Sequence, residues 1–245
     1  MCNERVWPNT TSYNAAISAC EKGKHWEVAL EFLNECKTWT MPDTISYSAA
    51  ISACEKGGEW QHALALLRTM CGERVWPNAT SYSAAISACE KGKHWEVALE
   101  LLKECKTWTT PNTISYSAAI SACEKGGQWQ HALALLQTMC DERVWPNTIS
   151  YNAAISACEK VKHWELALEL LKECKTWTTP DTISYNAAIS ACEKDGQWEQ
   201  SFALLQTMCD GRIWPDTTSY NAAMSACEKG KHGEMALEFL KECKS

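Results

Sequence analysis

The sequence contains no long hydrophobic stretch. Its longest uninterrupted apolar runs are five residues, as in Ala63–Leu67, whereas a membrane-spanning helix needs about 20 residues. The first residues, MCNERVWPN, lack the basic start and apolar core of a secretion signal, and they are not the Arg- and Ser-rich stretch of an organellar transit peptide. The sequence therefore predicts no membrane partner, and no targeting segment is visible in it.

The sequence also lacks the motifs of known catalytic sites. It has no HExxH, no phosphate-binding loop, no nucleophile elbow and no zinc-deaminase signature. Its six histidines recur at repeat-related places and do not form a base or a metal site. We therefore expect no enzyme activity, no cofactor and no metal.

A surplus of basic residues is missing as well. The chain has 23 Lys and Arg against 30 Asp and Glu, a net charge of −7, whereas nucleic-acid binders usually carry a basic surface. Cysteine is abundant, with 15 residues, but there is no CxxC motif and no Cys–His pair at metal-ligand spacing. Because the cysteines fall at two repeated places, we expect buried free thiols in a reducing compartment.

What the sequence does contain is a repeat of 34 or 35 residues. Its seven prolines and seven tyrosines keep the same register through the chain. The prolines are Pro8, Pro42, Pro77, Pro111, Pro146, Pro180 and Pro215, and the tyrosines are Tyr13, Tyr47, Tyr82, Tyr116, Tyr151, Tyr185 and Tyr220. A fixed period of this length is typical of a stacked array of small units rather than of one globular core.

The register divides most of the chain into complete units. Six of them occupy residues 10–43, 44–78, 79–112, 113–147, 148–181 and 182–216. We expect residues 1–9 to be the truncated end of an upstream repeat and residues 217–245 to be a partial seventh repeat. Alternate units are the most similar, so the near-identical module is a pair of 69 residues.

Each unit contains two helical patterns around a glycine break. In residues 44–57 the apolar side chains recur on one helical face; they are Tyr47, Ala50, Ile51 and Cys54. Thr44 or Ser46 is expected to supply the N-cap oxygen, and Gly57 and Gly58 to end the helix in the left-handed conformation. A second helix is expected from Trp60 to a point before Pro77. The predicted fold is all-α: fourteen helices in an α-solenoid of hairpins, coiled as a right-handed superhelix without a sheet.

The order of motifs resembles the pentatricopeptide repeat family over essentially the whole chain. It runs Ser-Tyr-Asn/Ser-Ala-Ala-Ile, Ala-Cys-Glu-Lys-Gly, Ala-Leu-x-Leu-Leu and then Pro-Asn/Asp. The tetratricopeptide repeat, which has a similar period, carries a Trp-Leu-Gly-Tyr first helix that is absent here. The resemblance implies that the first helices line a groove for single-stranded RNA and that each unit reads one base. We interpret the 13 tryptophans as packing between repeats rather than as a platform for bases.

The resemblance assigns base reading to two polar residues in each unit. The residue after the tyrosine is Asn14, Ser48, Ser83, Ser117, Asn152, Asn186 or Asn221, and the residue after the closing proline is Asp43, Asn78, Asn112, Asn147, Asp181 or Asp216. Variation confined to these polar types, within near-identical copies, is what a readout position would show. For the closing residue, helix capping and turn formation explain the pattern equally well.

The resemblance further implies contacts above the bases and along the phosphates. The base-wedging residues would be Thr11, Ile45, Thr80, Ile114, Ile149, Ile183 and Thr218, of which the threonines should grip less well. The phosphate-contacting residues would be Lys22, Lys56, Lys91, Lys125, Lys160, Lys194 and Lys229, although a solvated lysine favoured by the helix dipole explains them equally well. A glutamate precedes each lysine, and an acid in the groove should weaken phosphate binding.

The pairing rules of the family match Asn–Asp to uracil and Ser–Asn to adenine. Read from the N-terminus, the six complete pairs predict the target UAAAUU, and changing Asn147 to Asp should shift the preference at the fourth base from adenine to guanine. Single-stranded RNA is the expected partner of a monomeric protein, with other proteins as a further class of partner. Chloroplast or mitochondrion is expected by resemblance, with a role in RNA processing, stability or editing. The alternative is a protein-binding scaffold, which the acidic net charge favours.

Overall fold

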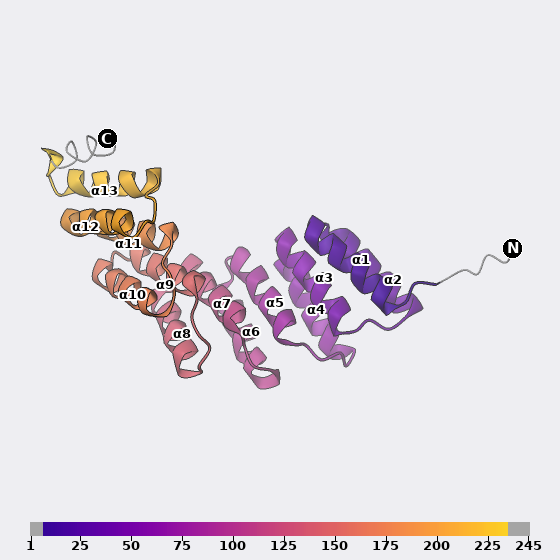
Figure 1. The fold of residues 1–245 in the computed structure, drawn as a ribbon. Coiled ribbons are helices and arrows are strands. Elements are labelled where there is room, and N and C mark those ends of the chain that lie inside the picture. The colour runs from indigo at the N-terminus through magenta and orange to yellow at the C-terminus, as the bar shows by residue number, and fades with distance from the viewer. Residues whose placement is uncertain (1–6, 235–245) are drawn as a thin grey trace. The chain divides into compact units, whose positions relative to one another are not determined.

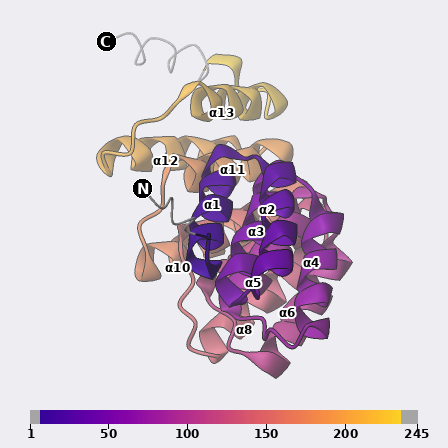
Figure 2. The ribbon, with the colours of Figure 1, turned by 90° about the vertical axis from the view of Figure 1, so that its right-hand side faces the viewer.

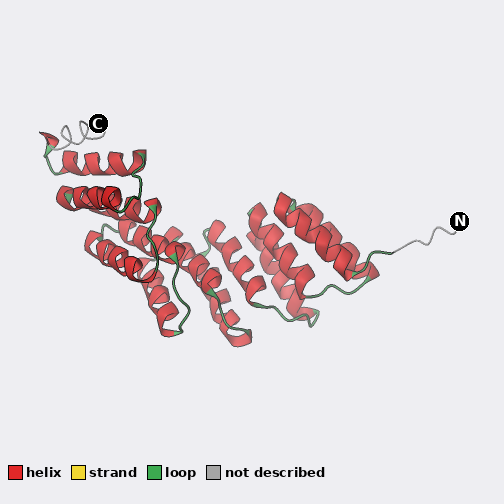
Figure 3. Cartoon of the chain, in the orientation of Figure 1, coloured by secondary structure: helices red, strands yellow, loops and turns green. Residues whose placement is uncertain are grey.

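The computed structural model describes residues 7–234, and within that range it contains helices and no strand (Figure 3). The odd-numbered helices are α1 (Thr10–Gly23), α3 (Thr44–Gly57), α5 (Ala79–Lys91), α7 (Thr113–Lys125), α9 (Thr148–Lys160), α11 (Thr182–Lys194) and α13 (Thr217–Lys229). The even-numbered helices are α2 (Trp26–Trp39), α4 (Trp60–Gly72), α6 (Trp95–Trp108), α8 (Trp129–Asp141), α10 (Trp164–Trp177) and α12 (Trp198–Asp210). The all-α solenoid is confirmed. Gly233 and Glu234 are helical, and the rest of the expected fourteenth helix lies outside the described residues.

The chain divides into two compact units between Ala122 and Cys123, within α7. In the first unit α1, α3 and α5 lie side by side, and each packs against the even-numbered helix that follows it (Figures 1 and 2). In the second unit α9, α11 and α13 form the corresponding row, with α10 and α12 as the hairpin partners of α9 and α11. Within each unit, successive hairpins thus pack through their odd-numbered helices.

Small side chains allow the odd-numbered helices to approach one another closely. In α3, for example, Tyr47, Ala50, Ile51, Ala53 and Cys54 are completely buried, as the helical periodicity predicts. The described cysteines are all free thiols. Burial raises the pKa of Cys54 to about 12, with the carboxylate of Glu59 adding to the effect, so this thiol stays protonated and inert.

The residue after each closing proline begins the next odd-numbered helix as its N-cap. Asp43 Oδ1 accepts a hydrogen bond from the backbone N–H of Ser46 at 2.9 Å, and Asp43 N–H donates to Ser46 Oγ at 3.1 Å. The expectation that Thr44 or Ser46 supplies the cap was therefore wrong: Ser46 is the third helical residue of a reciprocal capping box. The same reciprocal cap is made by Asn78, Asn112, Asn147, Asp181 and Asp216, whereas Asn9 caps α1 through its side chain alone.

The two glycines at the end of α3 have different roles. Gly58 adopts a left-handed φ of 83°, as predicted, whereas Gly57 is still helical. Gly57 is small because the ring of Trp26, from the preceding repeat, packs directly on it. Gly92 meets Trp60 in the same way, since a Cβ atom there would lie 2.8 Å from the Trp60 ring. These tryptophans therefore pack between repeats, as the sequence predicts.

Three of the tryptophans that precede a proline stack across repeats on the tryptophans at the ends of α2, α6 and α10. Ring centroids are 5.3 Å apart for Trp7 and Trp39 and 5.3 Å apart for Trp76 and Trp108. In the second unit Trp145 stacks on a neighbour, Trp177, at 5.1 Å. These rings remain more than half exposed, so the predicted packing between repeats is confirmed for them without burial.

Candidate functional site

The residues after the tyrosines and after the prolines come together at the N-terminal ends of the odd-numbered helices. Asn14 Nδ2 donates to Asp43 Oδ1 at 3.1 Å, because one turn of α1 lies beside the N-cap of α3. The equivalent distance from the amide nitrogen to the carboxylate is 3.1 Å for Asn152 and Asp181 and 3.1 Å for Asn186 and Asp216. The structure thus brings these predicted pairs into direct contact across the repeat boundary.

The serine-containing pairs use a hydroxyl bridge. Ser83 Oγ lies 3.1 Å from Asn112 Oδ1, and it also donates to the carbonyl oxygen of Ala79. Ser48 Oγ lies 2.7 Å from Ser81 Oγ, which in turn lies 3.0 Å from Asn78 Oδ1. Serine therefore holds the same place as asparagine but leaves more room next to the cap.

The remaining predicted base-reading residues are Ser117, Asn147 and Asn221. Ser117 lies in the first unit and Asn147 in the second, so each is described only within its own unit. Asn221, in α13, is exposed, and no closing residue faces it within the described range.

The capping bond fixes which polar atom of the closing residue remains available. Because Oδ1 accepts the backbone N–H, an asparagine cap keeps its Nδ2 donor and an aspartate cap has a second carboxylate oxygen as a further acceptor. In Asp43 this second oxygen also accepts from Asn14 Nδ2 at 3.3 Å. Within residues 7–234 the Nδ2 atoms of Asn78 and Asn112 have no protein partner. Asparagine and aspartate caps therefore differ at one atom, which is a hydrogen-bond donor in asparagine and an acceptor in aspartate.

Hydrogen bonds also keep the aspartate caps ionised. Burial would raise the pKa of Asp43, but the backbone N–H of Ser46 and the amide of Asn14 more than offset it, so the pKa falls below its ordinary value. At Asp181 burial again acts to raise the pKa, and hydrogen bonds from Ser184 and Asn152 lower it below its ordinary value. For Asp216 the backbone N–H of Ser219 is the largest cause of the lowered pKa.

A hollow of about 290 Å³ opens over one of these pairs. Ser48 and Asn78 lie in it, and the predicted wedging residues Ile45 and Thr80 flank it from consecutive repeats, with Glu21 also in its lining. All the predicted wedging residues are exposed, and the four isoleucines are 60–62% exposed in spite of being apolar. In the four repeats whose wedging residue is isoleucine, an apolar side chain is thus exposed to solvent.

The predicted phosphate-contacting lysines are joined to acids of the preceding repeat. Lys56 Nζ lies 2.8 Å from Glu21, and Lys194 Nζ lies 2.8 Å from Glu159. The same ion pair joins Lys91 to Glu55 at 2.5 Å, Lys160 to Glu124 at 2.6 Å and Lys229 to Glu193 at 2.5 Å. Of the other two lysines, Lys22 is exposed near the end of α1, and Lys125 ends α7.

The ion pair lowers the pKa of one of these acids, Glu193. Burial would raise the pKa of Glu193, but hydrogen bonds from Lys229 and Ser225 lower it below its ordinary value. The sequence shows a glutamate before every lysine, but not that each glutamate pairs with the lysine of the next repeat. That pairing spans 35 or 36 residues and follows only from how neighbouring helices stack.

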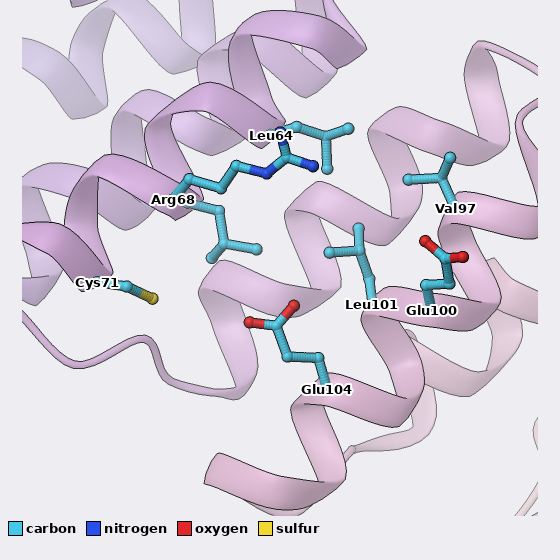
Figure 4. Close-up of a pocket in the computed structure, with 8 residues that line it drawn as sticks. Leu64, Arg68, Cys71, Val97, Glu100, Leu101 and Glu104 are labelled. Carbon is cyan, nitrogen blue, oxygen red and sulfur yellow. The ribbon is translucent and has the colours of Figure 1, made fainter.

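A second hollow, of about 230 Å³, is lined only by the even-numbered helices α4 and α6 (Figure 4). Its apolar lining comes from Leu64, Leu67, Val97 and Leu101, and its polar lining from Arg68, Glu100 and Glu104. Tyr82 donates its hydroxyl to Glu104 at 3.0 Å, which ties that acid to its own hairpin. The described residues contain no group of three or more metal-ligating side chains and no helix able to cross a membrane.

Three family models match the chain. The model described as "PPR repeat" matches residues 11–39, 80–108, 149–177 and 218–245. The model described as "PPR repeat family" matches residues 111–160 and 180–229, and the "Pentatricopeptide repeat domain" model matches residues 39–92. Together they leave only residues 109–110 and 178–179 unmatched between residue 11 and residue 245. No curated protein matches the chain.

Several solved structures share the fold. The pentatricopeptide repeat protein PPR10 in complex with an 18-nt psaJ RNA element aligns with a TM-score of 0.70 at 21% identity, over 97% of this chain and 34% of that one. PPR10 from maize aligns at 0.65 and 19% identity, over 98% of this chain and 39% of that one. The PPR domain of Arabidopsis thaliana protein-only RNase P 1, in complex with tRNA, aligns at 0.59 and 16% identity, over 66% of this chain and 86% of that domain. This chain therefore spans between a third and two fifths of the PPR10 chains.

Proposed function

This chain belongs to the pentatricopeptide repeat family, and from that membership we propose that it binds single-stranded RNA along its odd-numbered helices, one base per repeat. Two solved relatives of the same fold were crystallised with RNA, which supports the proposal at the level of the family. The observation in this chain that supports it most is the hollow over Ser48 and Asn78. Its lining combines polar side chains, among them Ser48 and Asn78, with the predicted wedging residues Ile45 and Thr80 of consecutive repeats.

The available atom of the cap explains how a repeat would choose its base. An asparagine cap offers an N–H donor, which suits the ring-nitrogen acceptor of adenine or cytosine. An aspartate cap offers an acceptor, which suits the ring N–H of uracil or guanine. The residue after the tyrosine would then separate the larger base from the smaller, since serine leaves room where asparagine fills it.

Applied to the six complete pairs, this chemistry supports the target UAAAUU. Asn–Asp boundaries, as in Asn14–Asp43, combine the smaller space with an acceptor and select uracil. Ser–Asn boundaries, as in Ser83–Asn112, combine the larger space with a donor and select adenine. The exposed isoleucines beside these boundaries would pack against the faces of the bases.

The sharpest test is the substitution Asn112→Asp. Aspartate caps a helix as well as asparagine does, so the fold should be unchanged while the available donor becomes an acceptor. The expected result is a switch from UAAAUU to UAGAUU, with a discrimination of about 1–3 kcal/mol by analogy with other base-edge contacts. Competition binding of both RNAs to both proteins measures it. An unchanged preference, with RNA binding retained, would show that the Asn/Asp alternation serves capping alone.

The further properties expected from the family remain part of the proposal. The protein would bind RNA without catalysing a reaction on it. It would act as a monomer in a chloroplast or mitochondrion, with other proteins as a further class of partner. The alternative function, a scaffold for proteins, is favoured by the net charge of −7 and by the hollow between α4 and α6. Filter binding of a random RNA pool at two salt concentrations separates the two functions, because a scaffold would retain no RNA at either.

A further inference from the structure

The glutamates in the last turn of the odd-numbered helices form a ladder with the lysines of the next repeat. Three of its rungs are spaced 69 residues apart and are nearly identical, with carboxylate-to-Nζ distances of 2.5–2.6 Å. These rungs are Glu55–Lys91, Glu124–Lys160 and Glu193–Lys229. The lysines are those that the proposed function assigns to RNA phosphates.

The two partners of a rung differ in exposure. The side chains of Glu55 and Glu124 are 16% and 15% exposed, whereas those of Lys91 and Lys160 are both 42% exposed. Each of these lysines also donates to the backbone carbonyl oxygen of its glutamate, at 3.1 Å and 2.8 Å. Each ammonium group therefore contacts two acceptors of one glutamate, its carboxylate and its carbonyl oxygen, while the lysine side chain stays partly exposed to solvent.

Helix stability does not explain these acids. A negative charge in the last turn opposes the helix dipole, and a partly exposed ion pair contributes little to folding. The lysine alone would satisfy the helix C-terminus. What the acid does change is the net charge of the row of lysines, which it cancels repeat by repeat.

We propose that the ladder glutamates set the affinity of the array for RNA by holding each phosphate-contacting lysine in an internal ion pair. The inference rests on the proposed function. A phosphate must compete with the carboxylate for the ammonium group, so the sequence-independent part of binding is weakened while the contacts to the bases are untouched. The array then depends on base recognition for its affinity, and it rejects RNA that lacks the matching bases.

The test compares two triple variants that change the net charge equally. Glu55→Gln, Glu124→Gln and Glu193→Gln remove three rungs, whereas the control Glu31→Gln, Glu100→Gln and Glu169→Gln removes three exposed acids of even-numbered helices, also 69 residues apart. The probes are one RNA with UAAAUU between cytosine flanks and one scrambled RNA of the same composition. Affinity is measured between about 50 and 200 mM salt, the range over which phosphate contacts lose most strength.

The ladder variant should bind both RNAs more tightly by the same factor. Its plot of log affinity against log salt should steepen by about 2, or about 0.7 per freed lysine on a single strand. The control should keep the slope of the unmodified chain, because its charges lie away from the lysines and are screened. An unchanged slope in the ladder variant, or an equal change in the control, would overturn the inference.

Two controls distinguish failure of this inference from unfolding of the variants and from failure of the proposed function. Glutamine keeps an acceptor for the lysine, so the thermal unfolding midpoints of both variants should stay close to that of the parent. Should the triple variant unfold, the single Glu124→Gln substitution, with an expected slope change of about 0.7, gives the same test. Binding with an unaltered slope removes this inference alone, whereas no RNA binding by any form removes the proposed function as well.

Discussion

At the scale of single residues, the closing Asn or Asp has two functions that use different atoms. Oδ1 caps the helix, and the remaining nitrogen or oxygen is the atom that we propose reads the base. Sequence reasoning treated capping and readout as competing explanations of the same residue. The structure shows the cap, and capping does not exclude readout, because a side-chain amide or carboxylate has two polar atoms.

The aspartate caps predict a dependence of stability on acid. The pKa values of Asp43, Asp181 and Asp216 are lowered in the folded chain, so their stabilisation is complete above the pKa of the unfolded state. It is lost as the pH falls through the lower folded-state pKa. The triple variant with asparagine at the three positions keeps its caps. It should match the parent at pH 7 in urea unfolding and lose less stability below about pH 4. Parallel losses in the two proteins would contradict this assignment.

The buried face of a helix could be predicted from the sequence of one repeat, but the N-cap residue could not. The buried face of Tyr47, Ala50, Ile51 and Cys54 could be predicted because periodicity reports burial directly. The N-cap could not, because Thr44, Ser46 and Asp43 are all capping residues within four positions. Only the backbone path from Pro42 into α3 shows which oxygen reaches the free N–H groups.

At the scale of the helix, the left-handed residue after each odd-numbered helix alternates between two residue types. It is Gly58, Gly127 and Gly196 in three repeats, and Lys24, Lys93, Lys162 and Lys231 in the others, where φ is 60–63°. A residue with a Cβ atom in this conformation costs about 1 kcal/mol more than glycine. The lysine repeats therefore carry strain that the glycine repeats lack.

Replacing Lys93 by glycine should stabilise the chain by about 1 kcal/mol, a rise in the unfolding midpoint of about 2–4 °C. Replacing Gly58 by alanine should have the opposite effect through the backbone alone, because no atom lies within 4 Å of the added Cβ. Calorimetry of the two variants and the parent provides the comparison. A lower midpoint for Lys93→Gly would show that the lysine side chain contributes more than its backbone conformation costs.

The packing of Trp26 on Gly57 shows why some helix-level features escaped prediction. Glycine at a helix end usually signals a left-handed turn, and for Gly58 that interpretation was right. For Gly57 the reason is the close approach of a ring from another repeat, which no pattern within the helix reports. Val161 holds the sequence position equivalent to Gly57, and in that repeat the rings of Trp129 and His163 meet at 63° rather than at the 39° of Trp60 and His94.

At the scale of the whole molecule, the repeat period alone predicted the fold. A unit of two short helices cannot bury its apolar faces by itself, so a fixed period of 34 or 35 residues implies stacking. The contacts between stacked units could not be predicted in the same way. The ladder of Glu and Lys and the stacked tryptophans join residues more than 30 positions apart, and a linear sequence does not say which of them meet.

The surface charge makes a prediction about association. A net charge of −7 opposes self-association, although tryptophans such as Trp39 and Trp108 remain exposed by more than half. We expect a monomer of 27.4 kDa at micromolar concentration and physiological salt. Light scattering after size exclusion measures the mass, and a dimer that persists on dilution would contradict the prediction. In that event the exposed tryptophan pairs would be the first surface to substitute.

The equivalence of Asn and Asp as caps has a consequence for how such an array changes over generations. Because either residue starts the helix equally well, a mutation between them alters the proposed target without passing through a poorly folded intermediate. Duplicated 69-residue modules start with identical preferences and can then drift apart one letter at a time. The feature that begins each helix is thus also what would make the binding specificity of the array easy to evolve.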